Sequence, residues 1–98
     1  MESKIVHQQL NGPGNTPGLR NMLICYLQYL MDYRRDVPGK DEYALYELHN
    51  LLSTKYVKSL PEDDPVCQLL HLSEQLEQAD PQRSKNIWTE LKNSIYEL

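Results

Sequence analysis

The sequence predicts an all-helical fold, namely a four-helix bundle with antiparallel or partly orthogonal neighbours behind a flexible N-terminal arm. Leucine is abundant, whereas the β-branched residues that favour strands are few and scattered. Threonine or aspartate directly precedes proline at three points, a pair typical of a helix start. Apolar residues recur at helical spacing between these points. With 98 residues the chain can build one core. We therefore expect an arm over residues 1–16 and a single helical domain over residues 17–98.

The arm is expected because turn-forming residues follow one another closely from Asn11 to Gly18. Glycine and proline at this density do not allow a continuous helix or strand. Residues Lys4 to Leu10 could form a short turn or strand when docked, but nothing in them demands it. We therefore expect little packing here, and we expect the chain to fold without residues 1–15.

Proline at the first helical position loses no hydrogen bond, and it holds the preceding residue in the extended conformation of an N-cap. Thr16, Asp64 and Asp80 each stand directly before a proline and are expected to cap helices. A further helix follows a proline-glycine turn, with Asp41 or a neighbour as its cap. Short connections favour antiparallel neighbours. The four helices are expected at residues 17–35, 40–58, 65–79 and 81–97.

Each of the last three helices has one apolar face, as expected for helices around a core. These faces comprise Ala44, Leu45, Leu48, Leu51, Leu52 and Tyr56 in the second helix, Val66, Leu69, Leu70, Ser73 and Leu76 in the third, and Ile87, Trp88, Leu91, Ile95 and Leu98 in the fourth. In the first helix, apolar residues cover more than half of the circumference. This helix is either central in the bundle or covered from outside, and a homodimer through it would provide such a cover.

The net charge of −4 argues against nucleic acid as a partner, because binding to phosphates requires clustered lysine and arginine. Residues 61–80 hold six acidic residues and no lysine or arginine. The longest apolar run, Met22 to Tyr26, is far too short to span a membrane, and no signal peptide opens the chain. We expect a cytoplasmic protein with Cys25 and Cys67 reduced.

Cys67, His71 and Glu74 have the spacing that places them on one face of the third helix, which we expect to face water. A structural zinc site needs a fourth ligand, and the sequence offers no paired motif to complete it. We therefore expect no metal and no cofactor. A convergent catalytic set is also missing from the sequence, so we expect no enzyme activity.

Tyrosine is the most informative residue type, with seven tyrosines against one tryptophan and no phenylalanine. Its apolar ring and polar tip suit surfaces that are alternately wet and buried. Tyr43 and Tyr46 project from the polar face of the second helix, where no intramolecular role is evident, so each is as readily a binding residue as an incidental exposed one. On the first helix, Tyr26, Tyr29 and Tyr33 follow one edge of the apolar sector. Core packing is the simpler explanation for Tyr26 and Tyr33, because aromatic residues at helical spacing usually belong to a core, and a binding role is the alternative.

Glu74 and Glu77 lie toward the C-terminal half of a helix, where the helix dipole disfavours negative charge. A solvated face explains them simply, and attraction to a basic partner is the alternative. The expected partner-binding residues are therefore Tyr29, Tyr33, Tyr43, Tyr46, Glu74 and Glu77.

The leading functional hypothesis is a protein-binding module with the size and acidity of an inhibitor, immunity, antitoxin or adaptor protein. Its partner would have a basic surface, because complementary charge speeds association and selects partners. The alternative is a dimeric transcriptional regulator in which the second and third helices form a helix-turn-helix. The third helix offers Gln68, Gln75 and Gln78 to a DNA groove but no basic residue, which disfavours this alternative.

Overall fold

The computed structural model describes residues 3–12 and 18–98, and within them every regular element is a helix. This confirms the all-helical class. The helices are α1 (Ser3–Leu10), α2 (Leu19–Asp36), α3 (Asp41–Leu52), α4 (Lys55–Lys58), α5 (Pro65–Glu77) and α6 (Pro81–Tyr96).

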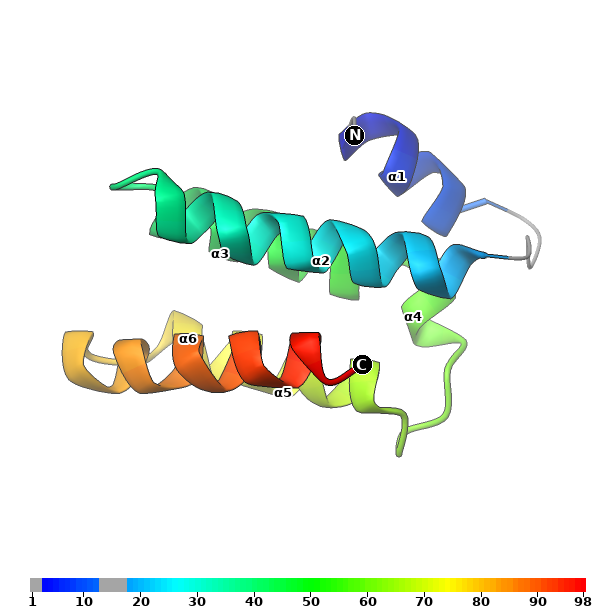
Figure 1. Cartoon of the computed structure of the whole chain (residues 1–98). Coiled ribbons are helices and arrows are strands. Elements are labelled where there is room, and N and C mark those ends of the chain that lie inside the picture. The colour runs from blue at the N-terminus through cyan, green and yellow to red at the C-terminus, as the bar shows by residue number, and fades with distance from the viewer. Residues whose placement is uncertain (1–2, 13–17) are drawn as a thin grey trace.

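The long helices lie in two layers (Figure 1). α2 and α3 run side by side in one layer, and α5 and α6 form the other. α3 packs on α5 and α2 packs on α6, so each layer contacts the other through both of its helices. The short helix α4 lies at the end where the chain passes from the first layer to the second, and α1 lies on the outer side of α2 (Figure 1).

The proline pairs mark two helix starts as predicted. α5 and α6 begin at the prolines themselves, and the aspartate before each proline is extended. Asp64 accepts a hydrogen bond from the Val66 backbone N–H at 2.9 Å, and Asp80 accepts one from the Arg83 backbone N–H at 2.8 Å. Each side chain thus satisfies an amide that has no partner within its own helix.

The first two long helices begin differently from the prediction. Thr16, the expected first cap, lies outside the described residues, and α2 begins at Leu19 after Gly18. Gly18 has a positive φ of 89°, which glycine adopts without steric cost. α3 begins at Asp41, and the preceding Lys40 makes no side-chain cap.

The prediction of a single helix over residues 40–58 is wrong, because the structure divides this range into two helices, α3 and α4. Thr54 between them is extended, and its hydroxyl donates to the Leu51 carbonyl at 2.9 Å. The Lys55 backbone N–H, at the start of α4, donates to the side chain of Asn11 at 3.1 Å. The break is therefore stabilised from both sides, once locally and once from the N-terminal region.

The expectation that the N-terminal residues pack little is also wrong for the part that the structure describes. Ser3–Leu10 is a helix, and its Val6 and Leu10 are fully buried in the core. These two residues lie one helical turn apart and form an apolar face, and α1 packs against α2 and α4. Residues 1–2 and 13–16 of the arm lie outside the described residues.

The core draws on every helix, with its members as follows: Val6, Leu10, Leu19, Leu23, Tyr26, Leu27, Leu30, Met31, Ala44, Leu48, Leu51, Leu52, Val57, Val66, Leu69, Leu76, Ile87, Trp88, Leu91 and Ile95. Trp88 is buried, as predicted. Of the apolar-face residues predicted, Leu45, Tyr56, Leu70 and Leu98 are only partly buried. No helix among the described residues combines the length and the apolar character needed to cross a membrane.

Candidate partner-binding surface

Four tyrosines form a continuous row of aromatic rings, which we call the tyrosine ladder. Tyr26, Tyr29 and Tyr33 come from successive turns of α2, and Tyr43 comes from the first turn of α3. Ring centroids are 5.7 Å apart between Tyr26 and Tyr29, 6.1 Å between Tyr29 and Tyr33, and 5.9 Å between Tyr33 and Tyr43. The last pair meets edge to face, a favoured geometry for aromatic rings. The ladder therefore joins α2 to α3 on the outside of their layer.

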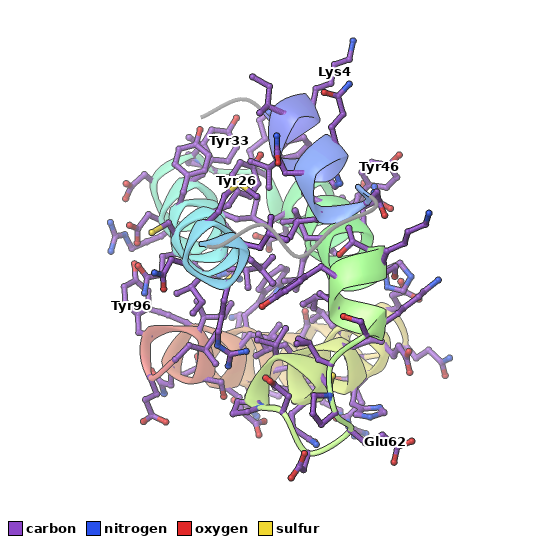
Figure 2. All side chains as sticks on the ribbon, turned by 90° about the vertical axis from the view of Figure 1, so that its right-hand side faces the viewer. Lys4, Tyr26, Tyr33, Tyr46, Glu62 and Tyr96 are labelled. Atoms are coloured by element: carbon purple, nitrogen blue, oxygen red, sulfur yellow. The ribbon has the colours of Figure 1, made fainter. Side chains whose placement is uncertain are left out.

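The ladder rises from the core to the surface. Tyr26 is only 2% exposed, Tyr33 is half-buried, and Tyr29 and Tyr43 are 51% and 45% exposed. Tyr26 and Tyr33 lie in the half of the molecule that carries α1, and Glu62 marks the opposite end (Figure 2). Tyr29 thus packs on the buried ring of Tyr26, and Tyr43 packs on the half-buried ring of Tyr33.

Contact with Tyr33 corrects the view that Tyr43 has no role within the monomer. Tyr46, one helical turn later, is 65% exposed, and none of the ring contacts found among the described residues involves it. Of the tyrosines predicted to bind a partner, Tyr46 therefore has the least intramolecular explanation. Figure 2 shows it projecting from the molecule on the side of α3.

Burial raises the pKa of Tyr43, and the nearby charge of Glu47 raises it further. The phenol consequently stays neutral to higher pH than an ordinary tyrosine. A neutral phenol retains its O–H, which can donate a hydrogen bond to a partner carbonyl or carboxylate.

Tyr96 is a further exposed tyrosine that the helical pattern did not single out. It lies near the end of α6, and its hydroxyl donates to the Asp32 carboxylate of α2 at 2.5 Å. This bond is the main reason that its pKa is raised. The neighbouring residue Ile95 faces the core. The apolar pattern of α6 therefore indicates that Tyr96 points outward, but this pattern does not reveal the contact of Tyr96 with α2.

Glu74 and Glu77, the two acids predicted to bind a partner, are both exposed on α5, and their surroundings differ. The Glu77 carboxylate lies 3.7 Å from Nδ1 of His49 on α3, so part of its role is explained within the monomer. Glu74 borders an open cavity of about 420 Å³ that is polar in character, and its lining residues are His71, Glu74, Gln75, Gln78 and Arg83.

One side-chain contact links the helix that carries Tyr46 to the helix that carries Glu77. His49 follows Tyr46 by three residues, so both project from neighbouring positions on the helix surface. His49 in turn lies 3.7 Å from the Glu77 carboxylate of α5. Tyr29 and Tyr33 lie beyond Tyr43 on α2. The candidate surface therefore runs from α2 across α3 to the acidic side of α5.

The Cys67, His71 and Glu74 face differs from the prediction at one position. His71 and Glu74 are exposed, but Cys67 is half-buried, and its thiol lies 3.9 Å from the Val57 carbonyl. Burial raises the pKa of Cys67, and the neighbouring acids Asp64, Glu62 and Asp63 raise it further. Across residues 3–12 and 18–98, no three or more histidine, cysteine or acidic side chains gather in a way that would hold a metal ion.

Comparison with known proteins gives no match for this chain among protein-family models, curated proteins or solved structures.

Proposed function

We propose that the chain is a small acidic protein-binding module that occludes or recruits a protein partner, as inhibitor, immunity, antitoxin and adaptor proteins do. In this proposal α2, α3, α5 and α6 form the four-helix bundle that serves as the rigid scaffold. Its setting is the cytoplasm, where thiols such as the unpaired Cys25 and Cys67 are kept reduced.

The tyrosine ladder, together with Tyr46, is the observation that carries the proposal. Tyrosine is enriched at protein interfaces because it contributes a large contact area and a polar tip with few rotatable bonds. Tyr29 and Tyr43 are held by contacts with Tyr26 and Tyr33, so they lose little freedom when a partner covers them. Binding costs less when the contacting side chains are ordered beforehand.

Charge supports a basic partner. The chain carries a net charge of −4, and Glu74 and Glu77 lie on the α5 side of the candidate surface. Negative charge on one partner and positive charge on the other accelerate encounter and suppress wrong pairings. Protein interfaces commonly have aromatic residues at their centre, which provide most of the binding energy, and charged residues at their rim. The proposed surface, with tyrosines at its centre and acids at its edge, has this arrangement.

The test is affinity capture followed by surface plasmon resonance on the captured protein. We predict that Tyr43→Ala weakens binding by about 2 kcal/mol, as expected for a buried anchor. Tyr46→Ala is expected to weaken it as well. Tyr96→Ala is the matched control, because this tyrosine is similarly exposed but belongs to α6. Unchanged affinity in both α3 variants, with helical circular dichroism retained, would remove this surface from the proposal.

Reversing both Glu74 and Glu77 to lysine tests the steering role. We predict a lower association rate, with a larger loss at low salt than at high salt because ions screen exposed charges. Because Glu77 contacts His49, the single variants are compared to separate steering from that internal contact. A change confined to the dissociation rate would contradict the steering role.

Two other outcomes belong to the same experiments. Capture of duplex DNA in place of a protein would favour the dimeric helix-turn-helix regulator, although the outward-facing acids of α5 disfavour it. A homodimer through α2 would appear as a doubled mass in light scattering, and Tyr29→Ala would reduce it.

A further inference from the structure

A small cavity where α2 meets α6 is lined by positive charge, although the chain as a whole is acidic. It has a volume of about 190 Å³, and its lining residues are Met31, Arg34, Arg35, Trp88, Thr89 and Lys92. Three of these side chains are basic and none is acidic. Three larger cavities differ, because each has at least one acid in its lining, namely Glu74 in the first, Asp63 and Glu97 in the second, and Glu62 in the third.

Arg34 is held in place beside this cavity. Its guanidinium lies over the ring of Trp88, 4.1 Å from the ring centroid. Its Nε approaches the Asp41 carboxylate at 3.0 Å, but no hydrogen bond to this buried nitrogen is found among the described residues. A buried donor without an acceptor is costly, and a guanidinium has further N–H donors on its two terminal nitrogens. Arg34 is therefore ordered and still has donors for a ligand.

Lys92 adds a positive charge that no neighbouring acid neutralises. Its side chain is exposed on α6, and across residues 3–12 and 18–98 no ion pair involves it. Arg35 is paired, because its guanidinium donates to the Asp36 carboxylate at 2.9 and 3.3 Å and lies 3.7 Å from Asp32. These pairs are open to solvent, and exposed ion pairs contribute little stability. Arg35 can therefore turn to another anion at little cost.

The size of the cavity and its charge limit the ligand. Sites that enclose a whole drug-sized ligand usually measure about 300–1,000 Å³, so this cavity has room for one small group. Arginine presents a planar fork of donors that matches the oxygens of a phosphate, and lysine contributes a point charge. A phosphate monoester carries about two negative charges near neutral pH, whereas a carboxylate carries one. Three basic side chains favour the more highly charged group.

We therefore propose that this cavity binds the phosphate group of a small ligand, either inorganic phosphate or a phosphate monoester whose organic part stays outside the cavity. Arg34 and Lys92 donate to the phosphate oxygens, and Arg35 adds positive charge. Acids farther away than about 8 Å weaken the site little, because physiological salt screens them. The site goes beyond the proposed function, since its lining shares no residue with the candidate partner-binding surface and it needs no protein partner.

Trp88 is the only tryptophan in the chain, so its fluorescence reports on this cavity directly. At pH 8 we expect sodium phosphate and phenyl phosphate to change the emission saturably, whereas sodium chloride at equal ionic strength does not. Isothermal titration calorimetry measures the dissociation constants. Lys92→Gln should weaken binding about tenfold, because a charge-assisted hydrogen bond is lost. Lys85→Gln is the matched control, because Lys85 is also exposed on α6 but lies outside the lining.

Arg34→Lys keeps the charge but removes the planar fork, so it should also weaken binding. Urea unfolding verifies that each variant is folded, and Lys92→Gln should keep the stability of the wild type because its side chain is exposed. Tighter binding of phenyl phosphate than of inorganic phosphate would assign the site to a monoester, and equal binding would assign it to the free ion; either result sustains the site. No saturable heat with either compound, or an equal loss of affinity in Lys92→Gln and Lys85→Gln, would overturn the inference.

Discussion

Trp88 of α6 contacts a side chain of α2. Its ring is buried on α6, and the Arg34 guanidinium of α2 lies over it, 4.1 Å from the ring centroid. Nε of Arg34 is 3.0 Å from the Asp41 carboxylate at the start of α3. One arginine thus contacts an aromatic face and an acid at a helix N-terminus, where negative charge is favourable.

Replacing Trp88 with alanine is predicted to destabilise the fold by about 3–5 kcal/mol, because a large buried ring leaves a cavity. Urea unfolding followed by circular dichroism measures the change. Arg34→Ala leaves the ring in place and is expected to cost only about 0.5–2 kcal/mol, the usual range of a cation–π contact. A Trp88→Ala loss no larger than that of Arg34→Ala would show that the ring adds little to the core.

At the scale of elements, α4 depends on a residue that is 44 positions away in the sequence, since Asn11 accepts from the Lys55 N–H. Asn11→Ala is predicted to cost about 1 kcal/mol, a typical loss for a helix cap. Amide hydrogen exchange at Lys55 should accelerate, while exchange within α6 keeps its rate. Asn11→Asp is the conservative variant, because it retains the acceptor oxygen. Unaltered exchange at Lys55 in Asn11→Ala would mean that α4 is stable without this bond.

The same contact explains why some elements could be predicted from the sequence and others could not. Asp64 and Asp80 cap amides two and three residues away, so a local motif contains all of the interaction. The division between α3 and α4 involves Asn11, which no local pattern connects to Lys55. α1 was missed because Val6 and Leu10 alone are too few to define a periodic face.

For the candidate surface, too, local sequence patterns predict exposure but not the contacts between helices. Exposure of Tyr46 follows from its place opposite the apolar face of α3, and the structure agrees. The packing of Tyr43 against Tyr33 depends on how α2 and α3 are placed relative to each other, which the pattern within either helix does not contain. The contact of Glu77 with His49 depends likewise on the placement of α3 against α5.

At the scale of the whole molecule, an ion pair joins the two layers. Two nitrogens of the Arg20 guanidinium on α2 donate to the two carboxylate oxygens of Asp64, the cap of α5, at 3.0 and 3.2 Å. The hydrogen bond from Arg20 is the main reason that the pKa of Asp64 is lowered from its ordinary value of 3.8, and the bond from the Val66 backbone N–H lowers it further.

A carboxyl whose pKa is lower in the folded chain stabilises the fold above its unfolded pKa, and this contribution is lost as the pH falls through the folded value. We therefore predict that stability decreases from about pH 3.8 downward as Asp64 takes up a proton. Urea unfolding at a series of pH values measures this, and Asp64→Asn should flatten that part of the profile. Asp63→Asn alters an exposed neighbour and is the matched control. A wild-type profile in Asp64→Asn would assign the acid sensitivity to other carboxyls.

The two-layer arrangement also bears on how the chain folds. Each layer consists of helices that are consecutive in sequence, α2 with α3 and α5 with α6, so most contacts inside a layer are local. Chains rich in local contacts fold quickly, because little loop entropy is lost before the contacts form. We therefore expect each helical hairpin to begin to form through its own contacts. Contacts between the layers, and the docking of α1 beside α4, join residues far apart in sequence. Because such contacts cost more loop entropy, we expect them to form after the contacts within each layer.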